Sequence, residues 1–322
     1  MKEFVIAKND SGQRVNKFLE KTVPLLPGGM MHKYLRLKRI KVNGKRTEAS
    51  YKLQEGDLIQ LYINDEYFES PKIEESWKKI STPSVDVVYQ DENILLANKV
   101  PGMVVHADET GSHNTLIAHI QAYLYQTGAW NPATENSFAP ALCNRIDRNT
   151  GGIVIAAKTA EALRILNDEI KARTLTKKYL CVVLGTPAQK QATLEHFLRR
   201  DENQKQVEVF DHPVPGAKTA RLIYQVLQSA NGLSLVECTL LTGRTHQIRA
   251  QMAHIGHPLL GDGKYGRNDK NRPYGETGQL LYSYKLKFDF PTENALSYLK
   301  NREFTVRDID FVKKYFPGYT IK

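Results

Sequence analysis

A polar loop that holds an aspartate between two arginines is the first place in this sequence where chemistry could occur. The loop, Asn144–Gly152, contains Asp147 with Arg145 and Arg148 on either side, and it leads into the apolar run Ile153–Ala157. Catalytic residues are often found on loops held by a rigid core. An aspartate beside cations stays ionised, which suits a nucleophile or a general base. A turn-capping aspartate that pairs with a neighbouring arginine explains the same residues equally well.

A second polar cluster follows in Leu241–Gly266. A predicted strand breaks at Gly243 and passes into a helix that carries arginine, histidine and glutamine side chains. Its histidines and one aspartate suggest a metal site, and with it a metal-dependent hydrolase. The stretch has no His-x-x-x-His pair, however, and its glycines indicate tight turns, so we expect no metal. The residues concerned are His246, His254, His257 and Asp262.

The bulk composition restricts which elements can position these clusters. A chain of 322 residues with 41% hydrophobic and 25% charged residues has room for one large and one small globular domain. Its net charge of +10 favours a nucleic-acid partner over an anionic membrane or an acidic protein. We see no export signal and no apolar run near the roughly 18 residues of a membrane helix. Three widely spaced cysteines fit a reducing cytoplasm rather than a disulfide framework.

Residues 1–63 form a segment with its own pattern. Apolar residues at helical spacing, a Pro/Gly break and a second helical stretch lead into a two-residue period around Asn43-Gly44, a strong hairpin signal. We expect a compact RNA-binding domain of two helices and a short β ribbon, with cations that follow phosphates. A solvated basic helix face is the simpler alternative. The expected RNA-binding cations of this domain are Lys33, Arg36, Lys38, Arg39, Lys41 and Lys45.

Residues 64–83 are acidic, then basic, and contain two prolines, which is typical of a linker. From residue 84 to 322 the pattern is one of strands and turns with few long helices. Strands are predicted at 85–89, 94–99, 153–157 and 179–184, with a helix at about 160–171 and a hairpin around Asn231-Gly232. The fold class is therefore α+β.

Several stretches resemble, in the same order, the motifs of the RluA-type pseudouridine synthases. The Asp147 loop resembles that family's His-Arg-Leu-Asp-Arg-Asp-Thr-Ser-Gly motif, and the resemblance spans about residues 84–290. Residues 1–63 resemble the small RNA-binding domain named after ribosomal protein S-four. The matching stretches are Lys99–His106, Asn144–Gly152, Lys177–Leu180, Gly243–Arg249 and Gly256–Asp262 in the catalytic part, and Arg14–Leu19, Arg39–Gly44 and Glu55–Asp57 in the N-terminal part.

The resemblance implies a catalytic fold with a mixed, largely antiparallel sheet, and an enzyme that converts uridine to pseudouridine without cofactor or metal. It implies that Asp147 is the nucleophile, that Arg244 pairs with it, and that Tyr179 stacks on the uracil and removes the proton from ring carbon 5. Arg145, with Arg148 beside it, is expected to contact the RNA and to occupy the place of the flipped base, and Leu260 to form an apolar wall of the pocket. The expected partner is structured RNA, most of all large-subunit ribosomal RNA, bound by a monomer without DNA or membrane.

Three departures from the family pattern bear on target choice: Asn144 replaces the usual His, Asn149 the usual Asp, and Gly151 the usual Ser. The stretch Ala250-Gln251-Met252 also replaces the commoner Val-His-Leu. None of them removes the expected nucleophile. The sequence leaves two alternatives open, a non-catalytic RNA-binding or ribosome-assembly protein and an enzyme acting on transfer RNA. It selects neither the uridine nor between attack at the sugar and at the base.

Overall fold

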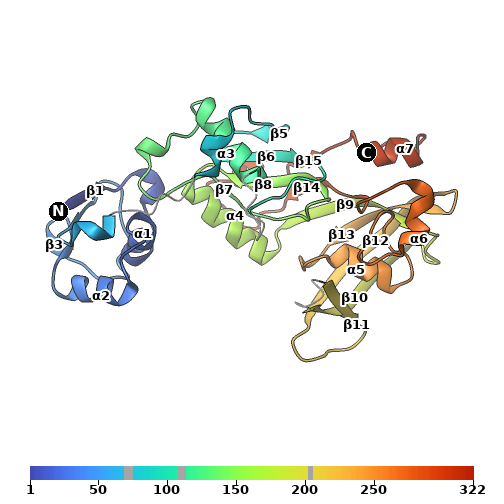
Figure 1. The fold of residues 1–322 in the computed structure, drawn as a ribbon, viewed down its shortest axis with the longest axis horizontal. Coiled ribbons are helices and arrows are strands. Elements are labelled where there is room, and N and C mark those ends of the chain that lie inside the picture. Colours follow the sequence, from blue (N-terminus) through green and yellow to red (C-terminus); the bar gives the residue numbers. More distant parts are fainter. Residues whose placement is uncertain (69–74, 108–113, 202–205) are drawn as a thin grey trace.

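The computed structural model describes residues 1–68, 75–107, 114–201 and 206–322. Its strands form two sheets: a four-stranded sheet near the N-terminus and an eleven-stranded sheet that runs through the rest of the molecule (Figure 1). Among the described residues, no helix is long and apolar enough to cross a membrane.

The N-terminal part is a small unit with its own core. Its four-stranded sheet has the order β1-β4-β2-β3, and the apolar face of α1, formed by Val15, Phe18 and Leu19, is buried against it. Asn43 and Gly44 have φ angles of 51° and 71°, as a type I′ hairpin turn requires. The elements are β1 (Lys2–Val5), η1 (Lys8–Asp10), α1 (Val15–Thr22), α2 (Gly28–Arg36), β2 (Ile40–Val42), β3 (Lys45–Arg46) and β4 (Leu58–Leu61).

The large sheet confirms the predicted fold class. Its order is β11-β10-β12-β13-β9-β14-β8-β6-β5, with β15 added to β14 and β7 to β8. Among the described strands, every pair is antiparallel except β8 with β14, so the sheet is mixed and largely antiparallel. The strands are β5 (Val87–Gln90), β6 (Ile94–Lys99), β7 (Ala141–Leu142), β8 (Gly151–Ala157), β9 (Leu175–Leu184), β10 (Gln191–Asp201), β11 (Gln206–Phe210), β12 (Lys218–Ala230), β13 (Leu233–Leu240), β14 (Leu281–Phe288) and β15 (Glu303–Thr305).

Helices cover both faces of this sheet. Alternate residues of β6 and β8 pack against α3 on one face and α4 on the other, which is why both strands are continuous apolar runs. Farther along, α5 packs with one face of β9 and α7 with the opposite face. The helices are α3 (Leu116–Gln126), α4 (Ala160–Ala172), α5 (Gln247–His254), α6 (Asn268–Asn271) and α7 (Asp310–Tyr315), and Thr115 and Thr159 cap the first two.

The segment predicted as a linker is partly built into the two units that it joins. The short helix η2 (Asp65–Phe68) adds Tyr67 and Phe68 to the N-terminal core. The helix η3 (Ser76–Lys79) buries Trp77 against the indole ring of Trp130, with ring centroids 5.4 Å apart. Residues 69–74 of the predicted linker lie outside the described residues.

The two units also touch through a polar interface. Asp10, fully buried, accepts hydrogen bonds from Ser137 Oγ (2.6 Å) and Asn136 Nδ2 (2.7 Å) of the catalytic part. Asn9 Nδ2 donates to Glu135 Oε1 at 2.7 Å. A buried carboxylate needs such donors, so these bonds fix the N-terminal unit on the catalytic part at this edge.

A close contact at the start of β8 explains one departure from the family pattern. A Cβ atom on Gly151 would lie 2.4 Å from Cε2 of Tyr282, whose ring is buried and whose hydroxyl donates to Asn98 Oδ1 at 2.6 Å. The aromatic ring thus occupies the space that a serine at this position would need.

We therefore expect Gly151→Ser to lower the free energy of unfolding by about 1–3 kcal/mol, the usual cost of overpacking a core. Urea unfolding followed by circular dichroism measures it. Gly318→Ser is the matched control, because a Cβ there meets open space. Equal effects of the two substitutions would contradict the proposed steric origin.

Candidate active site

The loop that carries Asp147 is held at both ends by hydrogen bonds. Asn144 Oδ1 accepts from the backbone N–H of Ile155 at 2.8 Å, which ties the start of the loop to β8. The backbone N–H of Thr150 donates to the carbonyl of Asp147 at 3.0 Å and closes a turn. The loop therefore presents Asp147 from a fixed backbone, with its side chain 28% exposed.

A buried lysine also holds the backbone of this loop through hydrogen bonds. Lys99, 1% exposed at the end of β6, donates from Nζ to the carbonyl oxygens of Arg148 (2.8 Å), Met103 (2.8 Å) and Val100 (3.1 Å). Burial lowers the pKa of Lys99 to about 8, and the nearby charge of Asp147 partly opposes that shift. Three carbonyl acceptors match the three N–H donors of the ammonium form, so we expect Lys99 to be charged at neutral pH.

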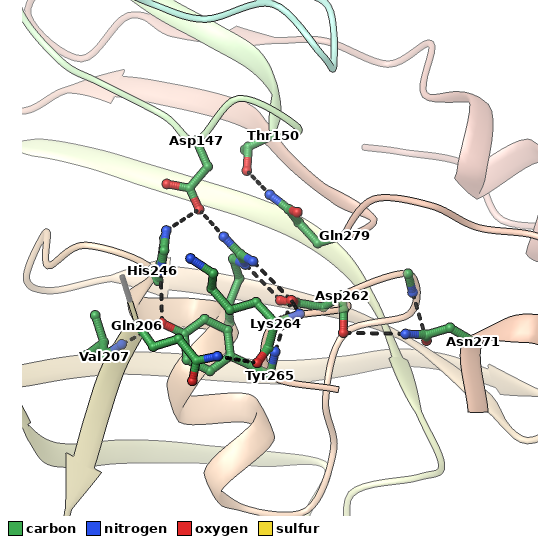
Figure 2. Close-up of polar contacts among 12 residues, drawn as sticks. Asp147, Thr150, Gln206, Val207, His246, Asp262, Lys264, Tyr265, Asn271 and Gln279 are labelled. Carbon is green, nitrogen blue, oxygen red and sulfur yellow. Dashed lines mark hydrogen bonds and ion pairs between the residues drawn. The ribbon is translucent and has the colours of Figure 1, made fainter. Parts of the chain in front are cut away.

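Asp147, Arg249 and Asp262 form a chain of ion pairs at the centre of the site (Figure 2). Arg249 Nη1 donates to Asp147 Oδ2 at 2.9 Å, while Nε and Nη2 bind the two oxygens of Asp262 at 2.7 and 2.9 Å. The side chain of Asp262 has no exposed surface. The guanidinium is thus fixed by a bidentate pair on one side and offers its remaining edge to Asp147.

The pairing with Asp262 outweighs the cost of burying these charges. Burial by itself disfavours the charged form of both groups, but the Asp262 carboxylate raises the pKa of Arg249 above its ordinary value. Arg249 and the backbone N–H groups of Lys264 and Tyr265 in turn hold the pKa of Asp262 below its usual range. Both groups are therefore ionised at neutral pH.

The expectation that Arg244 pairs with Asp147 is wrong. Arg244 precedes α5, and its Nε donates to the carbonyl oxygen of Thr219 in β12 at 3.0 Å. Arg249 instead lies in the first turn of α5, is 7% exposed, and carries its guanidinium to the loop. Among the described residues, Arg249 is the arginine that pairs with Asp147.

A histidine completes the surroundings of Asp147. His246, which precedes α5 in a left-handed conformation (φ 51°), lies with Nε2 3.8 Å from Asp147 Oδ2 (Figure 2). Its Nδ1 is 2.8 Å from the hydroxyl of Tyr265. Burial lowers the pKa of His246, although the charge of Asp147 opposes the shift. At neutral pH the ring is mostly uncharged and serves as a hydrogen-bonding neighbour rather than a second cation.

Tyr179 faces the same side of the sheet as α5. It lies in β9, is 6% exposed, and belongs to the core cluster that contains Ile248 and Met252 of α5. Burial raises the pKa of Tyr179 to about 12; a hydrogen bond with Ser283 opposes the rise, and the charge of Asp147 adds to it. The hydroxyl is therefore protonated at neutral pH.

Leu260 does not lie where it was expected. Leu260 is fully buried with Leu180 and Val182, on the face of β9 opposite Tyr179, so the expectation that it lines the pocket is wrong. Arg145 and Arg148 are both exposed beside Asp147.

The residues first considered for a metal do not converge. Asp262 binds Arg249, His246 contacts Tyr265, His257 Nδ1 lies 3.0 Å from the carbonyl of Leu184, and His254 pairs with Asp211. Lys99 and Asp262 both lie in stretches that match family motifs, but the sequence did not predict the hydrogen-bonding role of either residue. Arg249 and Arg244 both belong to the matched Gly243–Arg249 motif. Which of them reaches Asp147 depends on where α5 begins and on the direction of that helix.

We expect Asp262→Asn to destabilise the protein by about 3 kcal/mol at pH 7, because it leaves a buried arginine with one partner fewer. Since the pKa of Asp262 is lowered by folding, its contribution is present above the unfolded value of about 3.9 and is lost as pH falls below it. The deficit relative to the wild type should therefore shrink at acid pH. Thermal unfolding between pH 3 and 7 measures it.

Asp269→Asn is the control, because Asp269 forms an exposed pair with Arg267 at 2.8 Å and should contribute little. A pH-independent deficit in Asp262→Asn would contradict the electrostatic explanation.

Comparison with known proteins places this geometry in a family. The family model "RNA pseudouridylate synthase" matches residues 93–254. An uncharacterized RNA pseudouridine synthase of Bacillus subtilis is 30% identical over 290 residues, 90% of each chain. The ribosomal large subunit pseudouridine synthase C of Escherichia coli is 28% identical over 297 residues, 90% of this chain and 89% of that protein.

A solved structure has the same fold. Human RNA pseudouridylate synthase domain containing 4 superposes with a TM-score of 0.56 at 19% identity, over 75% of this chain and 95% of the human chain. The family match and the curated relatives confirm the resemblance seen in the motifs of the catalytic part. The chain belongs to the RNA pseudouridylate synthase family.

Proposed function

We propose that this protein converts specific uridines of large-subunit ribosomal RNA to pseudouridine, with Asp147 as the nucleophile. The observation that carries the proposal is the chain of ion pairs from Asp262 through Arg249 to Asp147. Arg249 holds the Asp147 carboxylate in place, and the 28% exposure of that side chain leaves it open to a substrate. Asp262 cannot take this role because its side chain is completely buried.

The main requirement of the reaction is a correctly positioned carboxylate. Asp147 attacks the sugar or the uracil ring, the glycosidic bond from nitrogen 1 breaks, and the base turns and rejoins the sugar through carbon 5. Asp147 is released, carbon 5 loses its proton and nitrogen 1 gains one, so the product is an isomer and needs no oxidant or phosphoryl donor. The uridine must leave its stack to reach Asp147, at a cost of a few kcal/mol.

Tyr179 is the proposed platform for the extruded base. Stacking of a base on an aromatic ring contributes roughly 1–3 kcal/mol. The phenol is protonated at neutral pH, because its pKa is raised to about 12. Proton removal from carbon 5 by Tyr179 therefore requires the hydroxyl to lose its own proton first, whereas stacking does not.

Exposed cations outside the loop provide a route for the RNA backbone. The six N-terminal cations lie on α2, β2 and β3 and in the turn after α2, and five of them are exposed; Lys41 is half-buried over the ring of Tyr62. None of the six forms an ion pair with a described carboxylate, so their charge remains available for phosphates. With Arg145 and Arg148, they define a basic surface at both the N-terminal unit and the catalytic loop.

The ribosomal target rests on the relatives and on the N-terminal unit. Several relatives are named ribosomal large subunit pseudouridine synthase C, and each is covered over most of its length. A basic domain that resembles the one named after ribosomal protein S-four fits a structured RNA substrate. A monomer acting in the cytoplasm, where ribosomes are assembled, is part of this proposal.

Asp147→Asn should abolish pseudouridine formation while RNA binding and the melting temperature change little, because the amide keeps the shape but is not a nucleophile. Pseudouridine mapping in total RNA from cells that lack the gene, complemented with wild type or Asp147→Asn, measures this. The large-subunit sites should return only with the wild type. Activity of Asp147→Asn near the wild-type level would refute the nucleophile, and sites restored in transfer RNA alone would refute the ribosomal target.

Arg249→Lys should reduce single-turnover pseudouridine formation about 100-fold, since one ammonium cannot bind Asp262 in two places and still aim Asp147. Arg244→Lys is the matched control, because Arg244 binds a backbone carbonyl rather than either carboxylate. A larger loss in Arg244→Lys than in Arg249→Lys would restore the original assignment.

Replacing Lys33, Arg36 and Arg39 together with glutamine should weaken RNA binding and flatten its salt dependence by about one unit of slope for each phosphate that is no longer neutralised. Filter binding between low and moderate salt provides the slope. Lys17→Gln serves as a control, because Lys17 is already paired with Glu20 at 2.7 Å. An unchanged slope in the triple variant would show that this surface does not bind phosphates.

A further inference from the structure

Three side chains from separate elements meet at the end of α5 that is farther from Asp147. His254 is the last residue of α5, His196 lies in β10, and Asp211 directly follows β11. Nε2 of His254 is 2.8 Å from Asp211 Oδ1, and Nε2 of His196 is 3.7 Å from the same oxygen. The three candidate ligand atoms all lie within 4.8 Å of one another. We propose that His196, Asp211 and His254 bind one divalent transition-metal ion, with Zn²⁺ as the best match.

His254 Nε2 and Asp211 Oδ1 are within hydrogen-bonding distance, and all three ligand atoms are close enough to share one ion after small adjustments. Bonds of 2.0–2.1 Å in a tetrahedral zinc site place neighbouring ligand atoms about 3.3 Å apart. The observed 2.8 and 3.7 Å lie on either side of that value. The longer distance exceeds a hydrogen bond. Two imidazoles and one carboxylate, with water in a fourth position, form a ligand set that zinc uses, whereas Mg²⁺ and Ca²⁺ prefer oxygen ligands.

His196 is the buried member of the cluster, at 8% exposure. A metal requires the unprotonated imidazole. His254 and Asp211 lie at the surface, where an ion can enter.

The fully buried Gln251 contacts the ring nitrogen of His196 that faces away from the cluster. Its Nε2 lies 2.9 Å from His196 Nδ1 and donates to the carbonyl of Ala220 at 3.2 Å, while its Oε1 is buried without a partner. Turned over, the amide presents Oε1 to Nδ1–H, which leaves Nε2 of His196 free for a metal. This rotation of the Gln251 amide breaks its hydrogen bond to the carbonyl of Ala220, and metal binding must offset that loss.

A metal here would cross-link the helix that carries Arg249 to the neighbouring sheet. Arg249 lies in the same helix as His254, five residues earlier. The strand β11, which ends just before Asp211, is joined to the active site through the bond from the Val207 N–H to the hydroxyl of Tyr265 (Figure 2). The proposed role is structural, and it does not depend on the reaction assigned to Asp147.

Zinc titration of untagged, chelator-treated, full-length protein tests the site. Isothermal calorimetry and metal analysis after dialysis should give one Zn²⁺ per chain, with a raised melting temperature. His254→Ala and Asp211→Ala should each weaken zinc binding at least about tenfold. Both replace surface side chains, and circular dichroism of the metal-free variants establishes that they are folded.

His212→Ala is the matched control, because His212 is exposed and adjoins Asp211 but is outside the cluster. It should bind zinc as the wild type does. Absence of stoichiometric zinc binding in the wild type would overturn the proposal, as would binding unaffected by both ligand substitutions. An equal loss in His212→Ala would overturn this choice of ligands.

Discussion

A single guanidinium divides its hydrogen bonds between two carboxylates, and the geometry of the site depends on that division. The flat fork of arginine supplies donors in fixed directions, so binding Asp262 through Nε and Nη2 determines where Nη1 points. Asp147 must then lie in that direction. The turn that presents Asp262 has its own requirement: Gly261 has a φ of 80°, and a Cβ there would lie 2.1 Å from the carbonyl oxygen of Gly278. One tight glycine turn is therefore needed to aim the Asp147 carboxylate.

Burial separates the roles of the two carboxylates. Asp262 is enclosed and tightly hydrogen-bonded, so it stabilises the arginine but cannot meet a substrate. Asp147 shares the same cation and remains partly open. The buried positive charge of Arg249 is therefore neutralised by two carboxylates. The enzyme can thus hold an accessible carboxylate at its surface without leaving an unpaired charge in its core. Lys99 has a comparable function for the backbone, since its three hydrogen bonds include one to the residue that follows Asp147.

The sequence was sufficient for features that depend on local chemistry. The hairpin at Asn43-Gly44, the apolar strand after the loop and the fold class follow from turn preferences, periodicity and motif order. The choice of Arg249 over Arg244 could not be predicted, because it depends on where α5 begins and how that helix crosses the sheet. The prediction for Leu260 was wrong for a related reason. A shift of one residue moves a side chain to the opposite face, and no sequence pattern fixed that register.

Three of the departures from the family pattern now have structural partners. Asn144 accepts a hydrogen bond from the backbone of β8, and Gly151 leaves room for the ring of Tyr282. Gln251, where histidine is commoner, lies buried against His196. Gly151 and Gln251 are buried and act within the scaffold, and half-buried Asn144 uses its side-chain oxygen to bind the backbone of β8. Differences in target choice between this protein and its relatives are then better sought in exposed groups, namely the loop arginines and the basic surface of the N-terminal unit. That distinction follows from burial alone, because a side chain enclosed by protein cannot read a base.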